Sequence, residues 1–160
     1  MPKVIANTSP IQYLFQLGLL DLLPRLYGSV LVPPAVRDEI NRGQALGVAL
    51  PNLDDLRWIA VADPEVPVLL PLANGLGAGE LQVIAVAKES AGHLALLDDR
   101  RARRFASLLG VTYSGTLGVL LKAKQRGMLE RLEPVCDALE ERGFRLSTRT
   151  RQSVLSMAEE

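Results

Sequence analysis

Amide and carboxylate side chains occur at places in this sequence that a parallel sheet would bring together. Asn7 follows one short apolar run, Asp98 and Asp99 follow another, and Glu80 lies in the first turn of an expected helix. Helical periodicity places Glu80 at the edge of that helix's apolar face, where a carboxylate is costly unless it is paired or binds a metal ion. Carboxylate and amide oxygens are the ligands that Mg²⁺ prefers, and two such ions can promote hydrolysis of a phosphodiester.

Each of these acids also has a simpler interpretation. Glu80 could complement the dipole of its helix, an effect of about 0.3–1 kcal/mol. Asp98 or Asp99 could cap the helix that follows them. Asp38 and Glu39 lie in the middle of another expected helix and could form a solvated face. Convergence of several oxygen donors at one sheet edge, next to basic residues, favours the metal site over these separate interpretations.

The elements that would position these residues alternate short strands with helices. Strands are expected at 4–6, 30–32, 58–61, 93–97 and 111–113. Helices are expected at 10–17, 19–27, 34–42 with an end at Gly43, 78–90, 100–109, 116–125, 129–142 and 148–158. Prolines at 64, 67 and 71 predict an extended, irregular segment. The alternation predicts an α/β fold with three α/β/α layers and a central, mostly parallel sheet, whose ligands collect at the carboxyl ends of the strands.

The composition excludes several other chemistries. The 160 residues include one cysteine and one histidine, Cys136 and His93, so a disulfide framework, a cysteine-rich zinc site and a histidine cluster are not expected. The 18 basic and 18 acidic residues balance, but residues 98–126 hold 7 basic and 2 acidic side chains. This basic block either faces solvent or contacts an anionic partner.

We expect a single cytoplasmic domain. The apolar stretch 11–23 is interrupted by Gln16 and Asp21 and ended by Pro24, so it is too short and too polar to cross a membrane. The N-terminus lacks the pattern of a signal peptide. The length of 160 residues suits one domain rather than two.

Part of the sequence matches a dinucleotide-binding fingerprint, but the match is incomplete and this interpretation is not favoured. Gly75 and Gly77 precede a helix, and Asp98 follows about 20 residues later, as in that fingerprint. Glu80 occupies the third glycine position, where its charge would oppose a pyrophosphate. The preceding apolar run, 68–70, is short and lies between two prolines.

Five segments in this order resemble PIN domains, and in particular small prokaryotic PIN-like proteins that include VapC-like toxins. The segments, spread over about residues 4–127, are VIANTSPI (4–11), VPPAVRDEI (32–40), GAGE (77–80), LLDDRRARR (96–104) and GTLGVLLKAKQRG (115–127). The resemblance implies a single PIN-like domain over 1–160, with a core at about 4–127 and C-terminal helices in 128–160. It also implies endoribonuclease activity dependent on Mg²⁺ or Mn²⁺, with hydrolysis of RNA phosphodiester bonds.

The resemblance also assigns candidate site residues. The acidic positions of the family fall on Asn7, Glu39, Glu80 and either Asp98 or Asp99, which would hold the metal. A hydroxyl that helps to place metal or substrate falls on Thr8 or Ser9. The expected phosphate contacts are Arg100, Arg101, Arg103, Arg104, Lys122, Lys124 and Arg126. The partners implied are RNA, a small antitoxin protein and a second copy of the chain, without a membrane.

Asn7 is the departure from the family pattern. An amide oxygen can ligate a metal ion, but it carries no charge and cannot act as a base. The leading interpretation is a ribonuclease of the toxin–antitoxin kind. The alternative is a catalytically weak or silent PIN-like protein that binds RNA or a partner. A third interpretation, an α/β enzyme for small molecules, predicts a closed pocket without converging carboxylates.

Overall fold

The computed structural model describes residues 3–62 and 75–160. The irregular segment predicted around prolines 64, 67 and 71, and the apolar run 68–70, lie outside these residues.

A sheet of five parallel strands forms the centre of the fold. The strands are β1 (Val4–Ala6), β2 (Val30–Val32), β3 (Ile59–Val61), β4 (Leu94–Leu96) and β5 (Thr112–Ser114), in the order β3-β2-β1-β4-β5. β1 lies in the middle, where Val4 pairs with Val30 of β2 on one side and with Leu94 of β4 on the other. All three residues of β1 are buried, as expected for a central strand covered on both faces.

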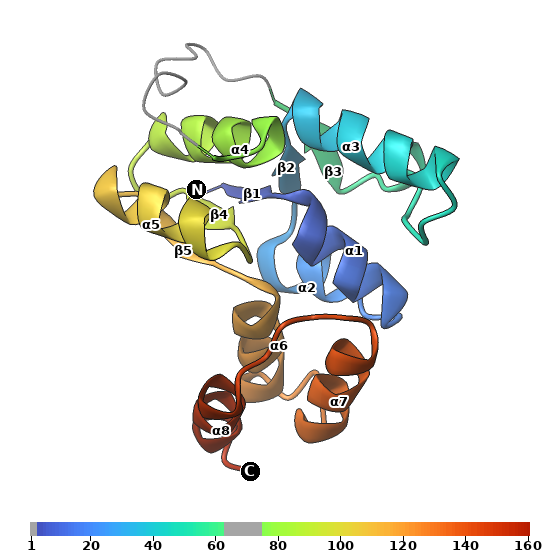
Figure 1. Ribbon diagram of the computed structural model, residues 1–160, viewed down its shortest axis with the longest axis vertical. Coiled ribbons are helices and arrows are strands. Elements are labelled where there is room, and N and C mark those ends of the chain that lie inside the picture. The colour runs from blue at the N-terminus through green and yellow to red at the C-terminus, as the bar shows by residue number, and fades with distance from the viewer. Residues whose placement is uncertain (1–2, 63–74) are drawn as a thin grey trace.

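Helices cover the two faces of this sheet. They are α1 (Thr8–Gln16), α2 (Leu22–Tyr27), α3 (Pro34–Ala45), α4 (Ala78–Lys88), α5 (Arg100–Leu108), α6 (Thr116–Gln125), α7 (Glu133–Glu141) and α8 (Thr148–Met157), with a 3₁₀ turn at Leu53–Asp55. Figure 1 shows α4 on one side of the strands and α2 and α6 on the other, with α7 and α8 beyond α6. The predicted three-layer α/β/α fold is confirmed, and every strand pair is parallel.

The core is aliphatic and lies on both sides of β1 and β4. Ile5 and Leu96 of these strands are fully buried, as are Ile84 of α4 and Leu120 of α6. This packing holds the carboxyl ends of β1 and β4 side by side, and Asn7 and Asp98 follow those ends closely. The core thereby fixes the relative positions of the residues that follow β1 and β4.

Several helix boundaries differ from the sequence prediction; for example, α2 begins at Leu22 instead of residue 19. For two of them the structure shows a physical reason. α3 continues through Gly43 to Ala45, and a Cβ on Gly43 would lie 2.6 Å from Cδ1 of Leu50. Gly43 therefore allows close packing of Leu50 and does not end the helix. α7 begins at Glu133 instead of residue 129 because Pro134 suits the first turn of a helix but not its interior.

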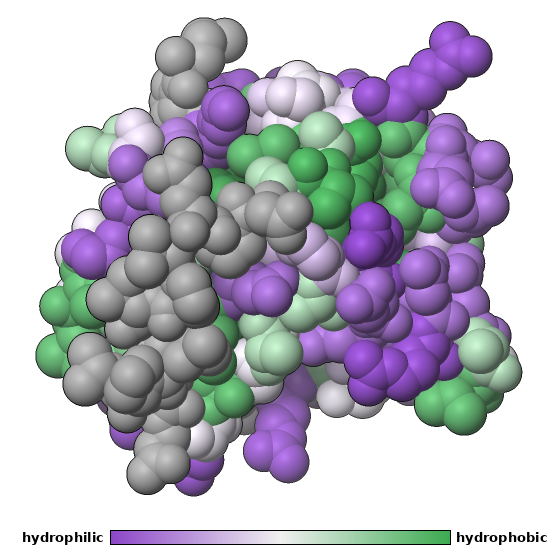
Figure 2. Space-filling view, turned by 90° about the horizontal axis from the view of Figure 1, so that it is seen from above, coloured by the Kyte–Doolittle hydropathy of each residue, from purple (hydrophilic) through white to green (hydrophobic). Residues whose placement is uncertain are grey.

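The surface mixes polar and apolar residues. Figure 2 shows the molecule from above the view of Figure 1, with a hydrophobic area set among hydrophilic residues. Among the helices in the described ranges, none combines the length and apolar character needed to cross a membrane.

Candidate functional site

Asn7 lies at the centre of the polar edge of the sheet. Its backbone N–H donates to the carbonyl of Leu96 at 3.1 Å, which continues the pairing of β1 with β4 beyond the last strand residue. The residue is only 7% exposed. Its Oδ1 is buried and has no hydrogen-bond partner within residues 3–62 and 75–160. A buried acceptor without a donor is costly, and a bound cation is one of the groups that can satisfy it.

Glu39 reaches the same edge from α3. Its Oε2 accepts a hydrogen bond from the Thr8 hydroxyl at 2.7 Å, which ties α3 to the first residue of α1. The carboxylate also lies against the start of α4, since a Cβ on Gly79 would be 2.7 Å from Glu39 Oε1. Glycine at 79 therefore leaves room for this carboxylate beside the residue that precedes Glu80.

Glu80 is half-buried in the first turn of α4. Burial raises the pKa of its carboxyl, and the negative charges of Asp99 and Glu39 raise it further, while a hydrogen bond from the Gly77 backbone partly opposes them. Asp99 and Glu39 therefore each lie close enough to Glu80 to repel its carboxylate. Such a group of acids is a favourable environment for a cation, because the cation relieves the repulsion.

Asp98 is held by three hydrogen bonds. Its Oδ2 accepts from the hydroxyls of Ser9 and Thr116, and its Oδ1 accepts from the Thr116 backbone N–H, each at 2.7 Å. A Cβ on Gly115 would lie 2.7 Å from Asp98 Oδ1 and 2.9 Å from the Leu97 carbonyl oxygen, so this approach requires glycine. Asp98 thus joins the starts of α1 and α6 to the end of β4.

Asp99 has a different set of contacts from Asp98. Its Oδ2 accepts from the Ala102 N–H at 3.0 Å, which makes Asp99 the N-cap of α5. Its charge is also the largest electrostatic contribution to the raised pKa of Glu80. Of the two aspartates, Asp99 is the one whose charge acts on Glu80.

The acidic side chains surround the edge without closing into a compact ligand shell. Within the described ranges, no three His, Cys, Asp or Glu side chains are arranged so that they could hold a metal ion. Glu39 and Asp98 instead accept hydrogen bonds from Thr8, Ser9 and Thr116. Two features of this edge suit a divalent cation: the Asn7 oxygen, which has no hydrogen-bond partner among the described residues, and the repulsion of Glu80 by Asp99 and Glu39.

The basic residues of α5 point in several directions. Arg103 donates from Nε to the Leu97 carbonyl at 2.7 Å, and its guanidinium lies 5.3 Å from the centre of the Tyr113 ring. Arg100 and Arg103 line a cavity together with Asp98, and Arg104 joins them at a more open hollow. Arg101 instead lies against Gly75.

The basic residues of α6 have contacts within the protein. Lys122 lies over the Tyr27 ring at 4.6 Å, and burial lowers the pKa of its amine. Lys124 donates to the Glu130 carbonyl and forms an ion pair with Glu160 at 3.6 Å. Arg126 is exposed at the end of α6. The α5 arginines therefore lie closer to the acidic edge, while the α6 lysines are engaged elsewhere.

Thr116 is a site residue that the sequence analysis missed. It is fully buried, and both its hydroxyl and its backbone N–H contact Asp98. The sequence feature that could have identified it is its position: Thr116 begins an expected helix, shortly after an expected strand. A polar residue at that position lies at the same edge of the sheet as Asn7 and Asp98.

Comparison with known proteins defines the family. Residues 3–160 match the model of the DUF3368 family, which is described as a PIN domain. The chain therefore belongs to this PIN-domain family, and its fold is nuclease-like. Neither the curated proteins nor the solved structures give a match to the chain.

Proposed function

We propose that this protein is a divalent-cation-dependent endoribonuclease whose site lies at the carboxyl ends of β1 and β4. The observation that carries the proposal is the buried Oδ1 of Asn7, which has no hydrogen-bond partner among the described residues, at the sheet edge where the charges of Asp99 and Glu39 act on Glu80. A neutral amide and three carboxylates from four elements supply oxygen donors of the kind Mg²⁺ and Mn²⁺ prefer. The PIN-domain family gives this arrangement its nuclease-like context.

The chain's own residues have distinct roles in this proposal. Asn7, Glu39, Glu80 and Asp99 would hold Mg²⁺ or Mn²⁺, which supplies activation of water and neutralisation of charge at the phosphate. Asp98 is a positioning residue, because Ser9 and Thr116 already occupy its oxygens. Thr8 orients Glu39 in the same way.

The arginines of α5 would bind the RNA backbone. Arg103 is held by the Leu97 carbonyl and by Tyr113, so little conformational freedom is lost when it contacts a phosphate. Arg100 and Arg104 are exposed on the same helix. Contacts of this kind position RNA without reading its sequence.

A second candidate function is supported by Asn7. The amide carries no negative charge, so the site lacks one of the charges that would attract a cation. A protein of this kind would bind RNA or a partner protein at the same surface without cleaving it. The toxin role and its partners, a small antitoxin and a second copy of the chain, belong to the first candidate and rest on the family resemblance.

The test is cleavage of a labelled single-stranded RNA by purified protein with Mn²⁺, with Glu80→Gln purified in parallel. We expect the wild type to cleave and Glu80→Gln to be slower by about 10²–10⁴-fold. Cleavage at the same rate by both proteins would mean a contaminating nuclease and would overturn the enzyme proposal. A wild type that binds RNA but does not cleave it would favour the second candidate.

A further inference from the structure

A cavity lies between α5, β5, α6 and α8, and Asp98 and Arg100, the two neighbours of the proposed metal ligand Asp99, belong to its lining. Its volume is about 450 Å³, which falls within the range of about 300–1,000 Å³ typical of ligand pockets. Asp98 and Gly115 both line the cavity, so the cavity borders the aspartate that connects the starts of α1 and α6 to the end of β4. A ligand that occupied the site could therefore extend into the cavity.

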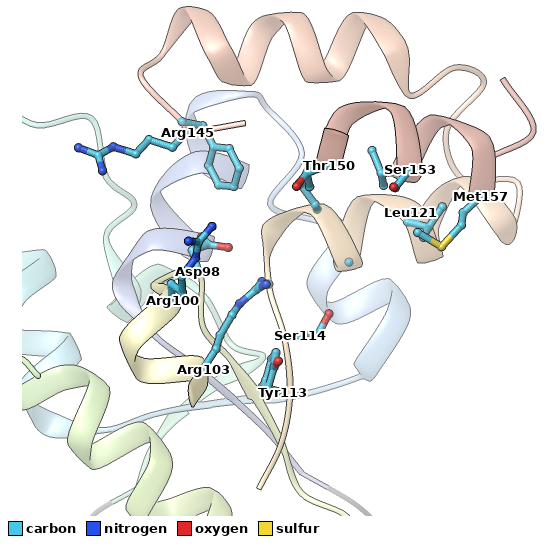
Figure 3. A pocket seen from close by; sticks show the side chains of 15 residues that line it. Asp98, Arg100, Arg103, Tyr113, Ser114, Leu121, Arg145, Thr150, Ser153 and Met157 are labelled. Atoms are coloured by element: carbon cyan, nitrogen blue, oxygen red, sulfur yellow. The ribbon is translucent and has the colours of Figure 1, made fainter. Parts of the chain in front are cut away.

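The cavity has a basic side and an apolar side. Arg100, Arg103 and Arg145 line it, and Asp98, the acid in its lining, is already hydrogen-bonded to Ser9 and Thr116. The apolar side is formed by Leu117 and Leu121 of α6, Val154 and Met157 of α8, and Phe144. In Figure 3, Arg103 extends from α5 toward the start of α6, and the side chain of Arg145 points away from Thr150 and Ser153 of α8.

This lining fits a nucleotide. Guanidinium groups bind phosphate, and an apolar surface with an aromatic ring and hydroxyl groups can accept a base that is unstacked from its neighbours. A second, more open hollow shares Arg100, Arg103 and Tyr113 with the cavity and adds Arg104. Two hollows that share arginines form a path that suits a polymer with repeating phosphates better than a single small anion.

We propose that the cavity between α6 and α8 receives one unpaired nucleotide of the RNA, adjacent to the phosphodiester at the metal site. The proposal rests on the proposed ribonuclease function and adds a nucleotide-binding subsite lined in part by α8. A duplex does not fit because its bases remain stacked and cannot enter a space between two helices. The cavity is thus a specificity site formed by the C-terminal helices.

The test is equilibrium binding of an end-labelled single-stranded RNA of mixed sequence and of the same RNA as a duplex. Fluorescence anisotropy in EDTA measures binding without cleavage. Ser153→Trp fills the cavity from α8, and Gln152→Trp is its control because residue 152 is exposed on the same helix and does not line the cavity. We expect Ser153→Trp to weaken single-strand binding by about tenfold, and Gln152→Trp to leave it unchanged.

A charge reversal provides a second variant that does not depend on packing. Arg145 lies in the exposed segment before α8, so Arg145→Glu should fold and reduce the slope of binding against salt by about 1. Arg142→Glu, at the end of α7 and outside the cavity, is its control. Preference of the wild type for single strands, lost in both cavity variants, supports the proposal.

Other results would overturn it. Wild-type RNA affinity in both Ser153→Trp and Arg145→Glu would exclude a nucleotide site. Equal binding of duplex and single-stranded RNA by the wild type would exclude it as well. The ribonuclease proposal is judged separately by Glu80→Gln cleavage. If the wild type cleaves RNA and the cavity variants bind RNA as the wild type does, the ribonuclease proposal stands and the nucleotide subsite is excluded. If the cavity variants bind RNA more weakly but the wild type does not cleave RNA, the nucleotide subsite stands and the ribonuclease proposal is excluded.

Discussion

At the scale of single residues, the site balances charge against burial. Burial raises the pKa of Glu80, and the negative charges of Asp99 and Glu39 raise it further. Asn7 is more buried than these acids, and an aspartate there would add a further charge to the group. The amide therefore favours the stability of the folded chain, while an aspartate would favour cation binding.

Glu80 gives this edge a defined dependence on pH. Because its folded pKa lies above its unfolded value, the folded state holds the Glu80 proton more tightly and loses stability as pH rises through that range. Glu80→Gln should raise the thermal unfolding midpoint at neutral pH in EDTA. The gain should shrink as pH falls and Glu80 in the wild type becomes protonated.

The matched control is Glu141→Gln, which removes an exposed carboxylate from the end of α7. Thermal unfolding followed by circular dichroism across pH measures both variants. A lower midpoint for Glu80→Gln at neutral pH would show that the Glu80 charge stabilises the fold and would contradict the assigned repulsion.

At the scale of elements, two adjacent aspartates have different roles where β4, α5 and α6 come together. Asp98 receives three hydrogen bonds and connects the ends of elements, whereas Asp99 caps α5 and acts on Glu80 through its charge. A partly buried carboxylate such as Asp98 contributes stability only while its hydrogen-bond donors are in place. Removing one donor should therefore weaken the whole junction.

Thr116→Val tests this junction because it keeps the shape of the side chain and removes the hydroxyl. Loss of a hydrogen bond to a charged group should lower the free energy of unfolding by about 1–3 kcal/mol. Thr112→Val, an exposed position on β5, is the control and should change little. Urea unfolding measures both variants, and equal stability of the two would remove the proposed role of Thr116.

The alternation of apolar runs with helical periods was sufficient to predict the layered fold and the sheet edge at which Asn7 and Asp98 meet. It could not separate Asp98 from Asp99, because both follow the same strand. Tertiary contacts distinguish them: Ser9 and Thr116 contact Asp98, whereas the charge of Asp99 acts on Glu80. The predicted helix end at Gly43 is wrong. The reason for glycine there is the packing of Leu50, a contact with a residue outside α3 that the helical pattern does not contain. Lys122 was expected to contact phosphate, but its position over the Tyr27 ring is a tertiary contact that the sequence pattern does not contain.

At the scale of the whole molecule, the C-terminal helices are tied to the rest of the chain by Glu160. Its carboxylate accepts from the backbone N–H groups of Leu132 and Glu133 at 2.6 and 3.2 Å, at the start of α7. It also lies 3.6 Å from the Lys124 amine of α6. Glu160 thereby holds the end of α8, which forms one wall of the proposed nucleotide cavity.

Glu160→Gln should loosen this connection. The backbone hydrogen bond from Leu132, the largest cause, lowers the pKa of the Glu160 carboxyl below its ordinary value of 4.5. A lowered pKa stabilises the fold above 4.5, and this stabilisation is lost as pH falls toward the folded pKa. We expect Glu160→Gln to lower the unfolding midpoint at neutral pH and to match the wild type in acid.

The control for this variant is Glu159→Gln, its exposed neighbour. Hydrogen exchange of α7 and α8, measured by mass spectrometry, should increase in Glu160→Gln and remain at the wild-type level in Glu159→Gln. Equal exchange in both variants would show that Glu160 does not hold the C-terminal helices.

The most direct test of the central claim is calorimetric titration of the protein with Mn²⁺. We predict that the wild type binds Mn²⁺, that Asn7→Asp binds it about tenfold more tightly because one negative charge is added, and that Glu80→Gln loses binding. Asp38→Asn, which removes an exposed carboxylate next to Glu39, should bind as the wild type does. Mn²⁺ binding that is unaltered by both Asn7→Asp and Glu80→Gln would contradict the site described at the ends of β1 and β4.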